Sequence, residues 1–286
     1  MIIYKHSEDL QSYLGEIKKN RQTIGFVPTM GALHEGHLSL IKKCRQNSDI
    51  TISSIFVNPA QFNNAEDFNK YPSNIENDIL LLEQNGCDVL FTPSEEEIYP
   101  DEASKSANYD LGYLEKILEG KFRPGHFQGV CLVVEKLLNI TNPNFLFLGQ
   151  KDYQQFLVIK KLIHIMGKEI KIILCPILRE PNGLAMSSRN LRLTATEINT
   201  AAYLYGQLEM IKKNVKPGNF TGLKNDAIDQ LKNAGFSVDY LEMAKSKNLE
   251  IIEDVNCENK EEYIILIAAF LNKIRLIDNI LVANPC

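Results

Sequence analysis

Membrane-spanning and secretory features are missing from the sequence. No apolar run approaches the length of a membrane span, and the first residues have neither the apolar core nor the small-residue cleavage site of a signal peptide. We therefore expect a cytoplasmic protein with no membrane partner. Basic residues are not in excess either, since 31 Lys and Arg stand against 36 Asp and Glu, a net charge of −5. Broad nucleic-acid binding needs a basic face, so we expect no nucleic-acid partner and favour small molecules.

Paired cysteines are also missing. The six cysteines are scattered and never form a Cys-x-x-Cys spacing: Cys44, Cys87, Cys131, Cys175, Cys257 and Cys286. This distribution favours reduced, structural thiols over a disulfide framework or a zinc site, and we expect none of them to be catalytic. The chain has no internal repeat and no low-complexity tract, and its 286 residues suffice for two domains.

What the chain does contain is a series of strand-like apolar runs that alternate with helical patterns. Strands are predicted at 23–27, 49–57, 88–91, 145–148 and 170–175, and helices at 7–19, 74–85, 127–139 and 153–166. This alternation predicts an α/β fold with a Rossmann-like parallel sheet, forming a nucleotide-binding domain over residues 1–176. Helical stretches at 194–214 and 222–234 and strand-like runs at 237–244, 263–271 and 273–282 predict a smaller α+β C-terminal domain over residues 177–286. Asn182-Gly183 is a plausible hinge neighbourhood between them.

Residues 25–37, GFVPTMGALHEGH, join the first buried strand to a helix that we expect to begin near His34. Pro28 has no N–H to donate and should end the strand, and Gly31 lets the backbone pass close to a ligand. The free N–H groups and positive dipole end of the helix should point back at the turn, which predicts a phosphate site within reach of His34 and His37. Zinc is the alternative, but zinc proteases space their histidines four apart in mid-helix, whereas these stand three apart at a helix start.

The string at residues 28–37, PTMGALHEGH, resembles the first signature of the pantothenate synthetase (pantoate–β-alanine ligase) family, within the nucleotidyltransferases that carry the HxGH motif. The resemblance continues in the same order over nearly the whole chain. It implies that the turn binds ATP and that His34 and His37 are catalytic. The implied ATP-binding residues here are Met30, Gly31, Ala32, Leu33, His34, Glu35, Gly36 and His37.

Two glutamines follow predicted strand ends, Gln61 and Gln155. A side-chain amide both donates and accepts, which suits the hydroxyls and carboxylate of a polar acid, although Gln61 alone would read as a surface amide. The resemblance implies that both glutamines bind pantoate and that Gln61 also binds β-alanine. Ser73 stands where the family usually has an arginine, so the role of that arginine is absent or supplied elsewhere. Asp78 could assist a magnesium ion, but we expect a solvated carboxylate on a helix surface, and the metal ligands stay unassigned.

A loop at residues 118–130, LEGKFRPGHFQGV, resembles the family's loop at this place. Its density of glycine beside arginine and histidine is typical of a shaped binding or interface loop. We expect Arg123 and His126 to support the site rather than to catalyse.

Residues 147–155, FLGQKDYQQ, repeat the order of strand, glycine and helix start. Lys151 can place a point charge on a phosphate, and Asp152 suits ribose hydroxyls or simple capping of the helix. The resemblance implies that Gly149, Gln150, Lys151 and Asp152 bind ATP.

The last signature, REPNGLAMSSRN at residues 179–190, resembles the superfamily's KMSKS-type loop, which closes over the β- and γ-phosphates. Its serines supply hydrogen-bond donors, and Arg189 supplies a planar, permanently charged fork. The resemblance adds Lys151 and Arg189 to the catalytic set. It adds to the ATP-binding set Leu178, Met186, Ser187, Ser188 and Arg189.

The resemblance as a whole implies an ATP-dependent ligase with pantoate, β-alanine and ATP as substrates. Pantoate would react with ATP and Mg²⁺ to give pantoyl adenylate and pyrophosphate, and β-alanine would then displace AMP to form pantothenate. A homodimer and a C-terminal domain that acts as a lid are also implied. Two alternatives stay open: another HxGH nucleotidyltransferase, which would not need both Gln61 and Gln155, and a non-catalytic nucleotide-binding protein. A synthetase acting on tRNA is disfavoured because the chain lacks a basic face.

Overall fold

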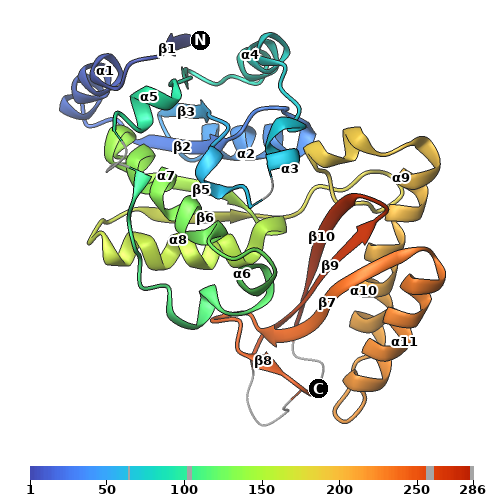
Figure 1. The fold of residues 1–286 in the computed structure, drawn as a ribbon. Helices are drawn as coiled ribbons and strands as arrows, with labels where there is room; N and C mark the ends of the chain where they lie inside the picture. The colour runs from blue at the N-terminus through green and yellow to red at the C-terminus, as the bar shows by residue number, and fades with distance from the viewer. Residues whose placement is uncertain (64, 102–104, 256–260, 284–286) are drawn as a thin grey trace. The chain divides into compact units, whose positions relative to one another are not determined.

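The computed structural model describes residues 1–63, 65–101, 105–255 and 261–283, so Cys257 and Cys286 lie outside the described residues. The chain forms two compact units. The first unit contains Met1–Gln150 and Gln155–Pro176, and the second contains Lys151–Gln154 and Ile177–Cys286 (Figure 1). Among the described helices, none is both long and apolar enough to cross a membrane.

The first unit is built on a six-stranded sheet whose described strand pairs are all parallel, in the order β1-β4-β3-β2-β5-β6. The chain runs from β2 to β3 to β4 on one side of β2 and returns to the other side with β5. This reversal makes a topological switch point beyond the ends of β2 and β5, where parallel sheets bind ligands. The strands are β1 (Ile2–Tyr4), β2 (Ile24–Thr29), β3 (Ile50–Ile55), β4 (Val89–Phe91), β5 (Phe145–Gly149) and β6 (Lys171–Cys175).

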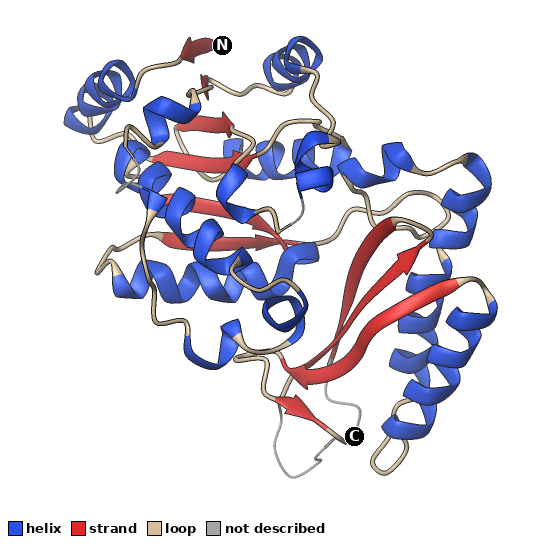
Figure 2. Ribbon diagram, in the orientation of Figure 1, coloured by secondary structure: helices blue, strands red, loops and turns tan. Residues whose placement is uncertain are grey.

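Helices cover both faces of this sheet (Figure 2). Buried residues of α1 (Ser7–Lys19), α7 (His126–Thr141) and α8 (Tyr153–Ile165) form one core cluster, and those of α2 (Glu35–Arg45) and α4 (Ile75–Gln84) form another. Neighbouring strand residues alternate between the clusters, as Phe26 and Val27 do, because successive side chains of a strand point to opposite faces. The α/β fold with a parallel sheet is therefore confirmed.

Pro28 does not end its strand, contrary to the prediction. β2 pairs with β3 through Pro28 and Thr29, but it pairs with β5 only at Gly25 and Phe26. The carbonyl of Ile24 accepts from Asn144 on the β5 side, so by the alternation of the ladder position 28 also faces β5. The missing N–H therefore falls where pairing with β5 has already stopped, and the ladder with β3 is untouched. Strand β1 was not predicted, because its three residues at the sheet edge are too few for a pattern.

The second unit is a four-stranded antiparallel sheet in the order β10-β9-β7-β8, packed against helices. Buried residues of α10, α11 and the three long strands form a single core cluster. The predicted α+β character is confirmed, although the helical stretch at 194–214 is two helices that meet at Ala202. The elements are α9 (Ala195–Ala201), α10 (Tyr203–Asn214), α11 (Phe220–Asn233), β7 (Phe236–Lys245), β8 (Ile251–Ile252), β9 (Tyr263–Leu271) and β10 (Ile274–Val282).

Candidate functional site

The turn after β2 is held by a buried carboxylate. Gly31 and Ala32 both have left-handed backbone conformations, with φ of 80° and 49°. Asp78 of α4 is 1% exposed, and its two carboxylate oxygens accept hydrogen bonds of 2.8 Å from the N–H groups of Ala32 and Leu33. A Cβ on residue 31 would lie 2.9 Å from Asp78 Oδ2, so glycine is required there for space as well as for φ.

This arrangement corrects one expectation, because Asp78 is buried and is not a solvated helix-surface carboxylate. The N–H groups of Ala32 and Leu33, which precede the helix, donate to Asp78, and the predicted ATP contacts of these two residues stay predictions. Burial raises the pKa of Asp78, while the two N–H donors act in the opposite direction. One sequence signal could have revealed this position: Asp78 stands four residues before Leu82, the other buried residue of α4, and so shares its inward face.

His34 and His37 form a capping arrangement at the start of α2. His34 Nδ1 accepts from the N–H of Gly36 at 3.1 Å, and His37 Nδ1 accepts from the N–H of His34 at 3.4 Å. The two rings lie 4.1 Å apart between centroids. Because each Nδ1 accepts, the neutral rings carry their proton on Nε2 and present it as a donor. A zinc ion would need a lone pair on Nε2, so this tautomer favours an anionic ligand over zinc.

Gln61 is fixed at both its side chain and its backbone. It ends the short 3₁₀ helix Pro59–Gln61. Its Oε1 accepts from Asn58 Nδ2 at 3.0 Å, and its Nε2 donates to the sulfur of Met30 at 3.1 Å. His126 Nδ1 donates to the carbonyl of Gln61 at 2.8 Å, while the other ring nitrogen of His126 lies 3.2 Å from Arg123. His126 therefore helps to fix the backbone of Gln61, which is consistent with a supporting role.

Asn58 connects this turn to α7. It is 1% exposed, accepts from the hydroxyl of Tyr99 at 2.8 Å and donates to the carbonyl of Gly129 at 3.1 Å. A Cβ on Gly129 would lie 2.1 Å from the carbonyl oxygen of Ala60, so only glycine allows α7 to pack this closely. Asn58 and Tyr99 were missed as contributors, because a sequence shows Asn-Pro as no more than a turn.

In the second unit, Lys151 contacts the serine-containing end of the last signature, residues 179–190. Lys151 Nζ donates to Ser187 Oγ at 3.3 Å, and the same hydroxyl accepts from the N–H of Arg189 at 3.3 Å. Ser187 thereby caps the 3₁₀ helix Ser188–Arg192, in which Ser188 is buried. The structure thus brings together Lys151, Ser187 and the backbone of Arg189, three of the predicted ATP-binding residues.

A small hairpin carries this loop. Arg179 and Ala185 form a β-bridge, and the N–H of Met186 donates to the carbonyl of Leu178 at 3.0 Å. The guanidinium of Arg179 makes two hydrogen bonds, of 2.6 and 3.0 Å, to the carboxylate of Asp278 on β10. It also lies 3.7 Å from the ring centroid of Tyr205. Arg179 is consequently a structural anchor of the hairpin.

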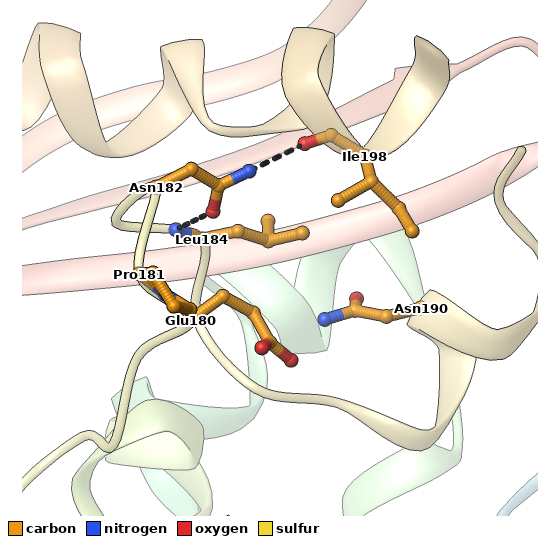
Figure 3. A pocket seen from close by; sticks show the side chains of 6 residues that line it. All are labelled: Glu180, Pro181, Asn182, Leu184, Asn190 and Ile198. Atoms are coloured by element: carbon orange, nitrogen blue, oxygen red, sulfur yellow. Dashed lines mark hydrogen bonds between the residues drawn. The ribbon is translucent and has the colours of Figure 1, made fainter. Parts of the chain in front are cut away.

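The turn of this hairpin lines a cavity of about 310 Å³ within the second unit. Figure 3 shows the two hydrogen bonds of Asn182, one of the lining residues: its Nδ2 donates to the carbonyl of Ile198 at 3.2 Å, and its Oδ1 accepts from the N–H of Leu184 at 3.1 Å. The predicted hinge neighbourhood Asn182-Gly183 thus lies inside the second unit, whose last boundary along the chain is between Pro176 and Ile177. The lining residues are Glu180, Pro181, Asn182, Leu184, Asn190 and Ile198.

The other predicted site residues lie at the ends of elements already described. Gly149 ends β5, Gln150 and Asp152 belong to the 3₁₀ turn that follows it, and Gln155 lies in the first turn of α8. Glu35 is exposed at the start of α2, with its carboxylate 3.6 Å from Lys42. Their positions at strand ends agree with the predicted ATP and pantoate contacts, which stay predictions.

Comparison with known proteins gives the class of enzyme. The family model described as pantoate-beta-alanine ligase matches residues 2–281. The pantothenate synthetase of Cytophaga hutchinsonii is 44% identical over 287 residues, covering 99% of both chains, and that of Flavobacterium psychrophilum is 44% identical over 286 residues, covering 98% of this chain and 99% of the other. The chain belongs to the pantoate–β-alanine ligase family, whose members are also named pantothenate synthetases.

Solved structures agree. The pantothenate synthetase of Thermus thermophilus superposes with a TM-score of 0.85 at 34% identity, covering 99% of this chain and 100% of that one. The pantoate-beta-alanine ligase of Francisella tularensis, complexed with beta-gamma ATP and beta-alanine, has a TM-score of 0.82 at 42% identity, covering 98% and 97%. The fold and the family assignment are therefore consistent over nearly the whole chain.

Proposed function

We propose that this protein joins pantoate to β-alanine in an ATP-dependent reaction that forms pantothenate. The observation that carries the proposal is the match to the pantoate–β-alanine ligase family over residues 2–281. The solved relative from Francisella tularensis, complexed with beta-gamma ATP and beta-alanine, supports ATP and β-alanine as substrates. Another HxGH nucleotidyltransferase or a non-catalytic nucleotide-binding protein is not favoured by these similarities.

The reaction has two steps. A carboxylate oxygen of pantoate attacks the α-phosphorus of ATP, and the bond to the β-phosphate breaks so that pyrophosphate leaves with the electron pair. The neutral amine of β-alanine then attacks the carbonyl carbon of the pantoyl adenylate, the bond to AMP breaks, and the extra proton on nitrogen passes to solvent. The first step needs alignment of the carboxylate and stabilisation of the charge on the phosphates, and the second needs mainly alignment, because the carbonyl of the adenylate is already activated.

The proposed roles follow from the donors described above. His34 and His37 carry Nε2–H groups, which stabilise the negative charge that develops on the phosphates. In this proposal His37 acts mainly by this electrostatic stabilisation. Lys151 and Arg189 supply positive charge to the same phosphates, and the hydroxyl groups of Ser187 and Ser188 supply hydrogen-bond donors. The remaining ATP contacts come from the turn after β2, the turn after β5, Leu178 and Met186.

Gln61 and Gln155 are proposed to bind pantoate, and Gln61 to bind β-alanine as well. The fixed amide of Gln61 supports this role, because an oriented amide recognises hydroxyl and carboxylate groups by their positions. If the amides pair with hydroxyls of pantoate, an analogue that lacks a hydroxyl should lose far more activity than one that lacks a methyl group. The opposite ranking would show that an apolar wall reads the acid.

Magnesium is proposed to enter as its complex with ATP. Among the described residues no group of three or more histidines, cysteines and carboxylates is placed to hold a metal ion, and both oxygens of Asp78 are taken by backbone donors. This suits a cation that is held mainly by water and by phosphate oxygens of the nucleotide, as Mg²⁺ commonly is. A cytoplasmic homodimer is also proposed, and a molar mass from light scattering tests the dimer.

Product analysis tests the function directly. The protein is incubated with ATP, Mg²⁺ and pantoate, with and without β-alanine, and the products are identified by mass. We expect pyrophosphate and pantoyl adenylate without β-alanine, and pantothenate with AMP when it is added. Nucleotide transfer to a different acceptor would support another nucleotidyltransferase, and ATP binding without any pantoate-dependent turnover would support a binding protein.

A further inference from the structure

Strand β10 carries two consecutive buried polar residues, Asp278 and Asn279. They are 4% and 1% exposed in a strand whose other buried residues are apolar. Buried polar side chains are costly unless they are hydrogen-bonded, so their partners identify what they do. Apart from the N–H of Asn279, which donates to Asp278, the side-chain partners described below lie in the two segments that carry Lys151 and Ser187.

Asn279 holds the backbone of Lys151. Its Nδ2 donates to the carbonyl of Lys151 at 2.9 Å. Its own backbone is fixed on both sides, because its N–H donates to Asp278 at 2.7 Å and its carbonyl accepts from Arg179 at 3.3 Å. The donor that reaches Lys151 therefore extends from a backbone that is hydrogen-bonded on both sides.

The same cluster anchors the partner of the lysine side chain. Arg179, bound by Asp278, begins the hairpin that leads to Ser187, and Ser187 Oγ accepts from Lys151 Nζ at 3.3 Å. The backbone and the ammonium group of Lys151 thus both depend on β10. The guanidinium of Arg179 pairs the carboxylate of Asp278 at 2.6 Å, so the hairpin that leads to Ser187 is held to β10 by a charged pair.

We propose that Asn279 is a positioning residue for Lys151, which sets the place of that charge during adenylate formation. This inference rests on the proposed role of Lys151 in binding the phosphates of ATP. Small displacements of a charged group in a preorganised site reduce the rate strongly, so the effect should appear in the first half-reaction and not in the attack of β-alanine.

A double-mutant cycle tests the proposal. Asn279→Ala should slow adenylate formation by about tenfold or more, whereas in a Lys151→Ala background the same change should cost less than about twofold, because the group that Asn279 positions is already gone. Lys151→Ala alone should slow adenylate formation by about a hundredfold. Rapid-quench measurement of pyrophosphate release gives all four rates, and attack of β-alanine on preformed adenylate is measured alongside them.

Three controls keep the outcome decisive. Gln207→Ala removes a buried amide of the same unit that donates to Gln230 at 3.0 Å, and it should leave both half-reactions unchanged. Asn279→Leu keeps a similar size, removes the donor and adds no charge beside Asp278, so it should reproduce the loss if Asn279→Ala fails to fold. An equal loss in the presence and absence of Lys151, or no loss at all, would overturn the positioning role. Normal adenylation by Lys151→Ala would instead refute the proposed role of the lysine itself.

Discussion

The carboxylate of Asp78 accepts a hydrogen bond of 2.8 Å from the backbone N–H of Leu33, a residue 45 positions earlier in the chain. This hydrogen bond joins α4 to the turn that leads into α2, and the N–H of Ala32 makes a second hydrogen bond to the same carboxylate. The turn is therefore shaped by a charge from elsewhere in the first unit, before any ligand arrives. The role of Asp78 is to hold Gly31 and Ala32, which have left-handed backbone conformations, in place before the two histidines.

Removal of this carboxylate should loosen the turn. Asp78→Ala leaves two buried N–H groups without acceptors, each worth about 1–3 kcal/mol, so we expect the free energy of unfolding to fall by about 3 kcal/mol and the KM for ATP to rise. Urea denaturation and steady-state kinetics measure these. The matched control is Asp49→Ala, because Asp49 is exposed and accepts from the backbone N–H and the hydroxyl of Thr23, each at 2.7 Å and at the surface. Water can replace these bonds, so the control should lose much less stability, and an equal loss in both variants would contradict the bracing role.

Two glycines in helices should respond oppositely to alanine. Gly129→Ala places a methyl group against the carbonyl of Ala60, which should cost about 1–3 kcal/mol and raise the KM for pantoate by shifting Gln61. Gly206 lies in the interior of α10 with open space around the position that an added Cβ would take, so Gly206→Ala should gain about 0.5–1 kcal/mol with unchanged kinetics. Thermal unfolding measures the stability of the two variants, and a pantoate titration measures their KM for pantoate. A harmless Gly129→Ala would mean that α7 can move away from the turn.

Arg189 should matter in one half-reaction. Arg189→Ala removes a permanent charge proposed for the phosphates, so pyrophosphate release should slow by about a hundredfold while attack of β-alanine on preformed adenylate changes little. Arg192→Ala is the control, since it removes the same charge from the end of the same 3₁₀ helix. Equal slowing of both half-reactions by Arg189→Ala, or no pyrophosphate without β-alanine, would be incompatible with the two-step assignment.

The buried thiols should make the protein sensitive to alkali. Burial raises the pKa of Cys87 to about 12 and that of Cys175 to about 11, above about 8.5 for a thiol in an unfolded chain. The folded protein holds these protons more tightly, so their contribution to stability is fully present below about pH 8.5 and is lost as the pH rises toward about 11. The free energy of unfolding in urea should therefore fall above about pH 9, and less steeply in Cys87→Ala. A free energy of unfolding that stays constant above about pH 9 would contradict the raised pKa of the buried thiols.

Periodic features of this fold were predictable from the sequence, and long-range polar contacts were not. The helix at 7–19 and the strand at 263–271 have the predicted bounds, because apolar spacing records which face of an element is buried. The spacing from Asp78 to Leu82 signals that Asp78 faces inward, but its partners are backbone groups of another segment, which no side-chain pattern reveals. Asn279 gave no signal at all: its acceptor is a carbonyl 128 residues away, and only the folded chain brings the two together.

The placement of Lys151–Gln154 in the second unit means that the chain crosses between the units three times, at 150/151, 154/155 and 176/177. A single cut cannot separate two self-sufficient halves. A fragment that begins at Ile177 would lack the carbonyl that Asn279 binds and the hydroxyl of Tyr153 that donates to Ser246 at 3.1 Å. Four residues in the middle of the chain, Lys151–Gln154, therefore belong to the C-terminal unit, and a version of that unit that folds alone would have to include or replace them.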